Sequence, residues 1–255
     1  MTDNIVFEQP LNEKCRTLLR LSHLFEQLDY HLPQEADWHA RAALRSLLDI
    51  ASVLSRADIK SELIKEMERH RVSLSRMTGS PGVDQNRLQH VLQNLQDTQR
   101  SIQSVQGQLA SQLRCSEFLN SVLQRSSIPG GGFDFDLPQL HYWLSQPHSE
   151  RMLQLDDWRN EVAVVHESVD LLLGLIRGSN LPQPQQAAQG FFQQTLPSGA
   201  SIQLVQVTLP TDAHLYAEIS GGKHRFTIRF MQTHDWEHPT PTDRNVAFGL
   251  NVCII

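Results

Sequence analysis

The stretch SNLPQPQQAAQG, residues 179–190, divides the chain into two parts whose sequences follow different patterns. Its two prolines and its glutamines are typical of a loop or a linker. Before it, apolar residues recur with the spacing of amphipathic helices. After it, short runs rich in β-forming residues alternate with turn residues. Together the patterns predict an α+β protein with a multi-helix part first and an antiparallel β part second.

The first part predicts a series of amphipathic helices. Asn12 is a candidate N-cap for the first one, and further helices are expected over residues 38–55 and 57–77. The turn TGSPGVD, residues 78–84, follows, and a near-heptad series of apolar residues then predicts one long helix through Leu113. The two long helices are expected to form an antiparallel hairpin. Its seam packs within one chain or, as the alternative, against a second copy.

The stretch SIPGGGFDFDLPQLHYWL, residues 127–144, contains three consecutive glycines that invite comparison with a phosphate-binding loop. Such a loop requires a lysine and a hydroxyl residue after its last glycine, whereas Phe133 and Asp134 follow here. An acidic side chain would repel phosphate, so a structural turn is the better interpretation. Asp136 is expected to cap the helix that has Pro138 in its first turn.

The second part predicts an antiparallel β-domain built from short strands. The apolar run at residues 5–7 is expected to leave the helical part and to add a strand to this sheet. We therefore expect a helical domain over residues 12–180 and a discontinuous β-domain of residues 1–11 and 181–255. The expected strands near the C-terminus cover residues 190–196, 201–209, 224–231 and 245–255.

Size and composition are those of an ordinary globular protein. The chain has 255 residues, of which 40% are hydrophobic and 20% charged, and its net charge is -6. Nucleic-acid binding domains are usually basic, so this balance argues against general nucleic-acid binding. Three widely spaced cysteines do not form a disulfide framework and fit a reducing cytoplasm. The N-terminal residues lack a signal pattern, and no segment predicts a membrane span.

The stretch SGGKHRFTIRF, residues 220–230, stands out in this acidic chain because it predicts a strand with one basic face. Such a face is either a solvated surface or a site for an acidic, extended ligand. The basic face is expected to hold Lys223, Arg225, Thr227 and Arg229, and the opposite face Phe226, Ile228 and Phe230.

The sequence predicts no catalytic, cofactor or metal site. The segment HDWEH places His234 and His238 four residues apart, but turn residues surround it and no third ligand is evident. The chain contains no nucleophile elbow, dinucleotide fingerprint or zinc-protease motif. What remains is recognition by charge and shape, so we expect a protein that is not an enzyme.

Four stretches carry a resemblance to a known family: FEQPLNEKCRTLLRL, GSPGVDQ, SIPGGGFDFDLPQLHYWL and ISGGKHRFTIRFM. Together they resemble the ZapD family of bacterial cell division proteins over essentially the whole chain. The resemblance implies a cytoplasmic homodimer at the mid-cell division ring, with a helical domain and a β-domain. It also implies binding to the C-terminal tail of FtsZ, the tubulin-like GTPase of that ring, and cross-linking of FtsZ filaments, without cofactor or enzymatic activity.

The resemblance also implies which residues contact the FtsZ tail. Taken singly, the two helical arginines are more typical of solvated surfaces, and the histidine is more typical of a packed or capping side chain. Two other functions remain open at this point: a coiled-coil scaffold that uses the helical hairpin, and a nucleic-acid binder that uses the same basic strand. The implied tail-binding residues are Arg20, Arg56, His141, Lys223, Arg225 and Arg229.

Overall fold

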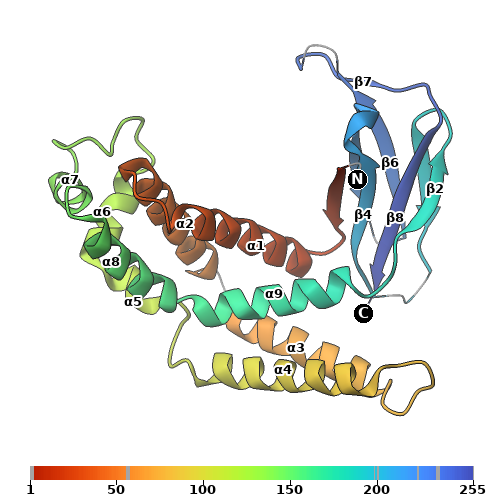
Figure 1. The fold of residues 1–255 in the computed structure, drawn as a ribbon, viewed down its shortest axis with the longest axis horizontal. Helices are drawn as coiled ribbons and strands as arrows, with labels where there is room; N and C mark the ends of the chain where they lie inside the picture. Colours follow the sequence, from red (N-terminus) through yellow and green to blue (C-terminus); the bar gives the residue numbers. More distant parts are fainter. Residues whose placement is uncertain are drawn as a thin grey trace. The chain divides into compact units, whose positions relative to one another are not determined.

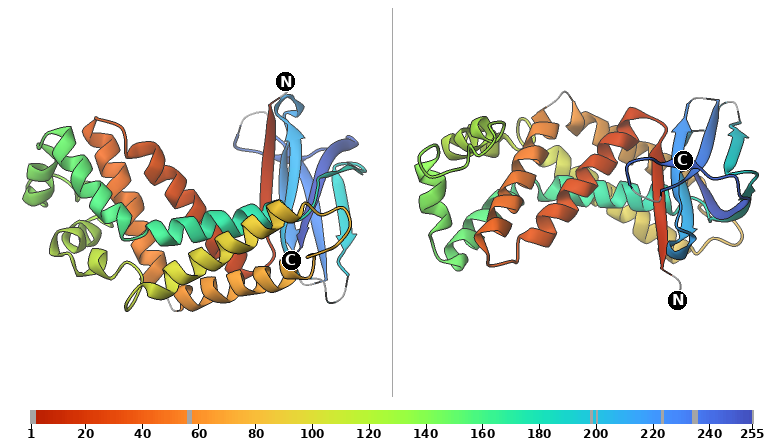
Figure 2. Two further views of the ribbon diagram at one scale, coloured as in Figure 1. Left: turned by 60° about the horizontal axis from the view of Figure 1, so that its bottom comes forward. Right: turned by 90° about the horizontal axis from the view of Figure 1, so that it is seen from above.

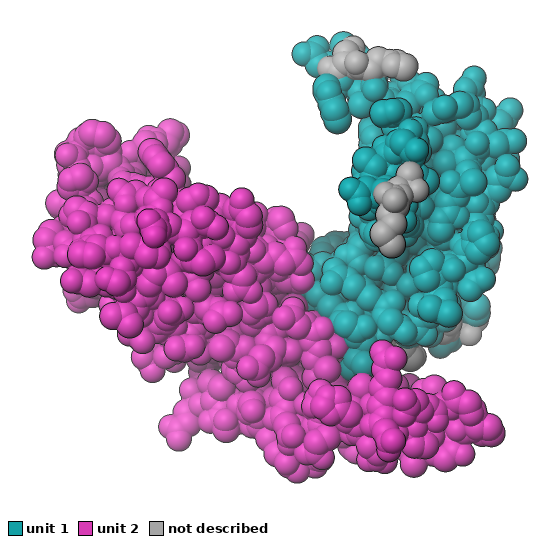
Figure 3. All heavy atoms as spheres, in the orientation of Figure 1, with its two compact units in different colours: residues 1–19, 173–255 teal, residues 20–172 magenta. Residues whose placement is uncertain are grey.

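The protein forms two compact units in a computed structural model (Figure 3). Residues 1–19 and 173–255 make up one, called the β unit, and residues 20–172 the other, called the helical unit. The domain limits expected from the sequence, at residues 12 and 180, remain a prediction. The structure describes residues 3–55, 58–197, 199, 201–222, 224–233 and 236–254.

The fold is α+β, as the sequence predicts, with the helices preceding most of the strands (Figure 1). Asn12 caps the first helix as expected, because its Oδ1 accepts a hydrogen bond of 2.9 Å from the backbone N–H of Cys15. The helices are α1 Glu13–His31, α2 Asp37–Ser55, α3 Ile59–Ser75, α4 Gln85–Ser104, α5 Ser111–Cys115, α6 Glu117–Arg125, α7 Pro138–Leu144, α8 His148–Asn160 and α9 Ala163–Arg177.

The predicted helical hairpin consists of α3 and α4, which pack against each other. Asp84 begins α4 as its N-cap, and its side chain accepts hydrogen bonds from the backbone N–H groups of Asn86 and Arg87 at 3.0 and 3.1 Å. The seam side chains of α4 are buried within the single chain, which favours the intrachain interpretation of the seam. They are Leu88, Leu95 and Ile102.

The second arm of the hairpin is shorter than predicted. α4 ends at Ser104, whereas the apolar spacing predicted a helix through Leu113. Val105 is extended, Gly107 has a φ of 73°, and Ala110 has a φ of 54°. A left-handed backbone cannot continue a right-handed helix, so the chain turns here and resumes as the short helix α5.

Asp136 does not cap α7, contrary to the prediction. The helix has Pro138 at its first position and Leu137 at its N-cap, without a side-chain capping bond. The Asp136 carboxylate instead lies 3.4 Å from the Arg125 guanidinium at the end of α6. The segment before α7 is therefore fixed to α6 by an ion pair rather than to α7 by a cap.

The described strands of the β unit form two antiparallel sheets (Figures 1 and 2). One has the order β1-β4-β8-β2 and the other β3-β6-β5, with β7 also paired to β6. A 3-10 turn, Thr211–Ala213, precedes β5. The strands are β1 Asn4–Pro10, β2 Gln183–Ala187, β3 Phe191–Thr195, β4 Ile202–Pro210, β5 Tyr216–Gly221, β6 Arg225–Gln232, β7 Thr240–Pro241 and β8 Val246–Ile254.

The pairing confirms one expectation about the strands and corrects two others. The N-terminal strand β1 joins the sheet by antiparallel pairing with β4, as predicted. The stretch at residues 179–190 is not wholly a loop, because it contains β2, which pairs with β8. The sequence also failed to predict β5, which pairs with β6.

The two sheets enclose one apolar core that takes buried side chains from both. Phe230 of β6 and Phe248 of β8 have ring centroids 5.0 Å apart, and Phe192 of β3 meets Phe248 edge to face at 5.3 Å. Since an antiparallel strand alternates its side chains between two faces, each sheet keeps a second face outside this core.

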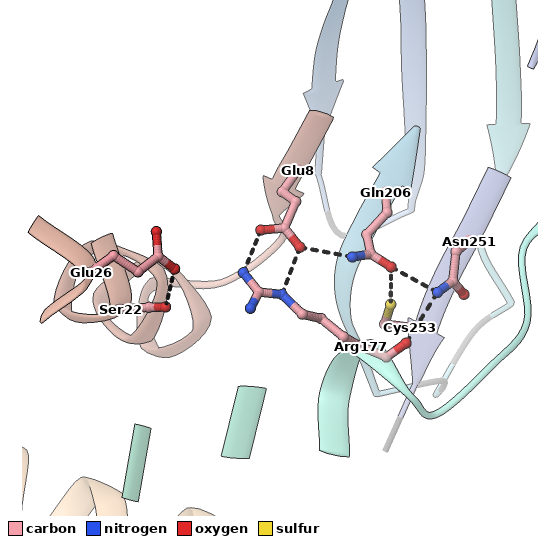
Figure 4. A network of polar contacts seen from close by, with 7 residues as sticks. All are labelled: Glu8, Ser22, Glu26, Arg177, Gln206, Asn251 and Cys253. Atoms are coloured by element: carbon pink, nitrogen blue, oxygen red, sulfur yellow. Dashed lines mark hydrogen bonds and ion pairs between the residues drawn. The ribbon is translucent and has the colours of Figure 1, made fainter. Parts of the chain in front are cut away.

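On the sheet β1-β4-β8-β2, a polar network lies on the face away from the core (Figure 4). The Arg177 guanidinium donates to both Glu8 carboxylate oxygens at 2.9 and 2.7 Å. Gln206 donates to Glu8 at 2.8 Å and accepts from Asn251 at 2.8 Å. Burial, and secondarily the Glu8 carboxylate, raises the pKa of the Cys253 thiol in this network to about 12. The network joins the end of α9 to β1, β4 and β8, and its thiol is unreactive at neutral pH.

Candidate functional site

The strand β6 has the two-faced character that the sequence predicts. Phe226, Ile228 and Phe230 are fully buried in the core between the sheets. Arg225 and Arg229, which alternate with them, are exposed on the opposite face. The buried rings fix the strand, and the strand in turn fixes the direction of both arginine side chains.

The strands on either side of β6 complete this surface, which we call the basic face. Phe191 of β3, with 44% of its surface exposed, lies opposite Arg229 in the strand register, and Glu218 of β5 lies opposite Arg229 on the other side. The surface therefore combines cations, one exposed ring and one carboxylate. The basic face consists of Phe191, Gln193, Thr195, Glu218, Ser220, Arg225, Thr227 and Arg229.

Both guanidinium groups of the basic face are available for a ligand. Neither Arg225 nor Arg229 forms a side-chain hydrogen bond or an ion pair with any residue that the structure describes. Glu218 faces Arg229 across the register, yet no ion pair joins these two side chains. An acidic ligand would therefore not have to displace an existing partner from either arginine.

A peptide can approach β6 only through its side chains, because the backbone of this strand is already paired. It lies between β3 and β5, with β7 also paired to its end, so it offers no free edge for an added strand. A surface hollow of about 440 Å³ at the turn from β5 to β6 is lined by residues that include Ser220, His224 and Arg225. This hollow extends the basic face toward the turn.

The other implied tail-binding residues are distributed over the chain. Arg20 of α1 and His141 of α7 are exposed and belong to the helical unit. Neither side chain forms a hydrogen bond or a ring contact with another residue that the structure describes. His141 is thus not the packed histidine that its aromatic neighbours suggested. Arg56 and Lys223 lie outside the described residues.

Sequence reasoning missed the members of the basic face that β3 and β5 supply, among them the carboxylate of Glu218 and the ring of Phe191. Glu218 was overlooked because β5 itself was not predicted, and Phe191 because it was considered only as part of a strand. A usable signal existed for Glu218: in the segment YAEISG, Ala217 and Ile219 alternate with Glu218 and Ser220, which is a strand pattern with a polar outer face.

The described residues lack the features of a metal site with three protein ligands and of a membrane-spanning helix. They contain no group of three or more histidine, cysteine or carboxylate side chains arranged to hold a metal ion. No helix in these ranges has both the length and the apolar character needed to cross a bilayer. His234, one of the histidines weighed as a metal ligand, lies outside the described ranges.

Comparison with known proteins defines the class to which the chain is related. The family model described as "ZapD: Cell division protein" matches residues 19–229. A "Cell division protein ZapD" from Methylococcus capsulatus is 38% identical over 255 residues, which is 100% of both chains. The class is that of bacterial cell division proteins. Within it, this chain belongs to the ZapD family.

Proposed function

We propose that this protein binds the C-terminal tail of FtsZ through the basic face and, as a homodimer, cross-links FtsZ filaments in the cytoplasm at the division ring. The observation that carries the proposal is the pair Arg225 and Arg229, which are exposed, unpaired by other described residues, and held on a strand whose inner face is fully buried. FtsZ is proposed as the partner because the resemblance to the ZapD family implies it, and membership of this cell division family supports the choice.

The geometry of the basic face suits an extended peptide that mixes acidic and apolar residues, the character expected of the FtsZ tail. Same-face positions along a strand are about 7 Å apart, so Arg225 and Arg229 are about 14 Å apart. Acidic residues four positions apart in an extended peptide have the same spacing. Arginine pairs with carboxylates in a bidentate manner, and Phe191 offers an apolar contact beside Arg229.

Four further residues are proposed as contributors to the same binding. Lys223 precedes the strand in sequence, and Arg20, Arg56 and His141 are proposed to add contacts from the helical unit. They rest on the family resemblance rather than on geometry, so we expect their individual substitutions to weaken tail binding less than substitution of Arg225 or Arg229.

Bundling then follows from two weak sites acting together. A two-fold dimer has two identical basic faces and can hold tails from two filaments. A filament displays many tails, so the second contact forms at high effective concentration and the avidity exceeds either single affinity. Charges on an exposed surface are screened within about 8 Å at physiological ionic strength, so salt should weaken each single contact.

The test is a filament pelleting assay at low centrifugal force, in which FtsZ sediments only when it is bundled. We expect the wild-type protein to pellet FtsZ and Arg225→Glu to fail while remaining folded. Arg87→Glu is the matched control, since Arg87 is an exposed arginine of α4, and it should behave as wild type. Bundling by a folded Arg225→Glu protein at wild-type levels would contradict the proposal.

Nucleic-acid binding is the alternative function that the basic face of β6 suggests. The rings of β6 that could stack on bases, Phe226 and Phe230, are fully buried in the core, so among the members of the basic face only Phe191 exposes a ring. The net charge of -6 also opposes binding to a polyanion. A gel-shift assay with single- and double-stranded DNA is expected to show no binding at physiological salt.

A further inference from the structure

The end of α1 and the start of α2 bring two histidine side chains into direct contact. His31 is the last residue of α1, and His39 lies in the first turn of α2. Their Nδ1 atoms are 2.8 Å apart, and their ring centroids are 5.1 Å apart. The proposed function uses neither histidine, so this contact calls for an explanation of its own.

Contact between the same atom of both rings limits where the pair can hold its protons. A neutral imidazole carries one proton, on Nδ1 or on Nε2. The two Nδ1 atoms form a hydrogen bond only when one ring carries its proton on Nδ1 and the other ring on Nε2. When both rings carry their protons on Nε2, two lone pairs lie close together, and a cation that both nitrogens bind relieves their repulsion.

The spacing of the two nitrogens matches that of neighbouring ligands around a transition metal ion. A metal ion lies about 2.0–2.1 Å from an imidazole nitrogen, so two nitrogens at a right angle around it are about 2.9 Å apart, and two at a tetrahedral angle about 3.3 Å. The observed 2.8 Å is close to the right-angle value, which is typical of Cu²⁺ and Ni²⁺. Because the ion lies beside the line between the nitrogens, each ring has only to turn about its side-chain bonds.

The loop between α1 and α2 is fixed, so the two histidines are held in place before any ion binds. Arg151 of α8 is buried, and its guanidinium donates to the carbonyl of Glu35 at 2.6 Å and binds the Asp37 carboxylate. The backbone N–H of His39 donates to the carbonyl of Ala36 at 2.9 Å. Metal sites depend on such support, because the ligands must keep their geometry without further ordering.

The surroundings of the pair suit a cation that keeps some of its water. Both histidine rings are half-buried, so each of them remains partly open to solvent. The ring of Tyr30 lies edge-on to that of His31, with centroids 5.1 Å apart, and 6.4 Å from that of His39. The chain between the histidines contains two carboxylates, Glu35 and Asp37, and no lysine or arginine, so its charge favours a positive ion.

We propose that His31 and His39 bind a divalent transition metal ion of the Cu²⁺ and Ni²⁺ class, with water as its remaining ligands. Imidazole nitrogens suit these ions, whereas Mg²⁺ and Ca²⁺ take oxygen ligands. The bound ion connects the end of α1 to the start of α2 and thereby stabilises the helical unit. This site goes beyond tail binding and does not depend on it, because neither ligand is among the proposed tail-binding residues.

The direct test is calorimetric titration of untagged, chelator-treated protein with NiCl₂. All proteins carry Cys115→Ser, because Cys115 is exposed and a thiolate also binds metal. This background protein is expected to bind Ni²⁺, and His39→Gln to bind it at least about tenfold more weakly. His23→Gln is the control, since the ring of His23 contacts Gln27 rather than a second histidine, and it should bind as the background protein does. Absence of binding by the background protein, or equal binding by His39→Gln, would overturn the proposal.

A second test identifies the ligands and uses the other histidine. Electron paramagnetic resonance of the background protein with one equivalent of Cu²⁺ is expected to show coupling to two nitrogens, and that of His31→Gln to one. Ni²⁺ should also raise the melting temperature of the background protein, because an ion that binds only the folded state stabilises it, and should leave that of His31→Gln unchanged. The same nitrogen coupling in a folded His31→Gln protein would place the ion elsewhere and contradict the proposal.

Discussion

The two outer faces of the β unit place arginine side chains in two different settings, one paired and one exposed. On the sheet β1-β4-β8-β2, Arg177 donates to both carboxylate oxygens of Glu8 and belongs to a network that joins the end of α9 to β1, β4 and β8 (Figure 4). On the sheet β3-β6-β5, Arg225 and Arg229 point outward and have no side-chain partner among the described residues. The first arginine holds elements together, and the other two make no such contact within the described part of the chain.

The difference shows that pairing and exposure decide what a polar side chain does. A charge that leaves water must find a partner, so the half-exposed Arg177 is tied to Glu8. A charge that stays in water needs no partner, so an exposed arginine without one lowers the free energy of unfolding very little. A polar group that is buried without a full set of partners should then be the most expensive arrangement, and His70 provides that case.

The largest effect is expected from acidification at His70 of α3. This side chain is buried, and its Nε2 has no hydrogen-bond partner among the described residues. Burial, with a smaller contribution from Arg69, lowers the pKa of His70 from 6.5 to about 4, while Glu66 opposes the shift. The folded state therefore favours the neutral ring, and stability falls as the pH drops from about 6.5 to about 4, by about 3 kcal/mol in total.

Urea unfolding monitored at pH 7.5, 5.5 and 4.5 measures this loss. His70→Leu should flatten the pH dependence in this range. The matched control His90→Gln, at an exposed histidine of α4 in the same hairpin, should keep it. An unchanged slope in His70→Leu would show that other groups cause the acid sensitivity.

The next effect concerns the two kinds of arginine directly. Arg177→Ala removes two charge-assisted hydrogen bonds and leaves the Glu8 carboxylate with the Gln206 amide but without its cation, so it should lower the free energy of unfolding by about 2 kcal/mol. Arg225→Ala removes an exposed side chain without a described partner and should change the free energy by less than about 0.5 kcal/mol. Thermal and urea unfolding of both variants check this contrast. Equal destabilisation by Arg177→Ala and Arg225→Ala would contradict the distinction between the paired and the exposed arginines.

The smallest effect is expected at Glu218, the carboxylate opposite Arg229 on the basic face. Glu218→Gln removes a negative charge that repels an acidic peptide, and it should strengthen tail binding by about two- to fivefold. Glu150→Gln at an exposed position of α8 is the control and should leave the affinity unchanged. Weaker binding by Glu218→Gln would place the ligand elsewhere.

The sequence predicts a strand of this fold well where only one face of that strand is buried. The segment RFTIRF alternates because only one face of β6 meets the core, so both the strand and its basic face were predictable. The segment QPQQA has no such alternation, since β2 owes its conformation to backbone pairing with β8 rather than to its own side chains. Pairing partners distant in sequence leave no local pattern.

The same reasoning explains the errors in the helical unit. A heptad series shows which side chains prefer burial, but it does not report the backbone angles at Gly107 and Ala110 that end α4 early. Likewise, Asp136 precedes a helix start in the sequence, but the sequence does not show that its carboxylate forms an ion pair with Arg125. Arg20 and His141 carry no physical signal of their own and entered only through the family resemblance.

The central claim is that the FtsZ tail binds the basic face, and fluorescence anisotropy of a labelled FtsZ C-terminal peptide tests it most directly. The peptide is titrated with wild type and with Arg225→Glu/Arg229→Glu at low and at physiological salt. We predict salt-sensitive binding by wild type and a loss of about a hundredfold or more in the double variant, because two charge-assisted contacts are removed. Equal binding by both folded proteins would contradict the account and leave this strand a solvated surface.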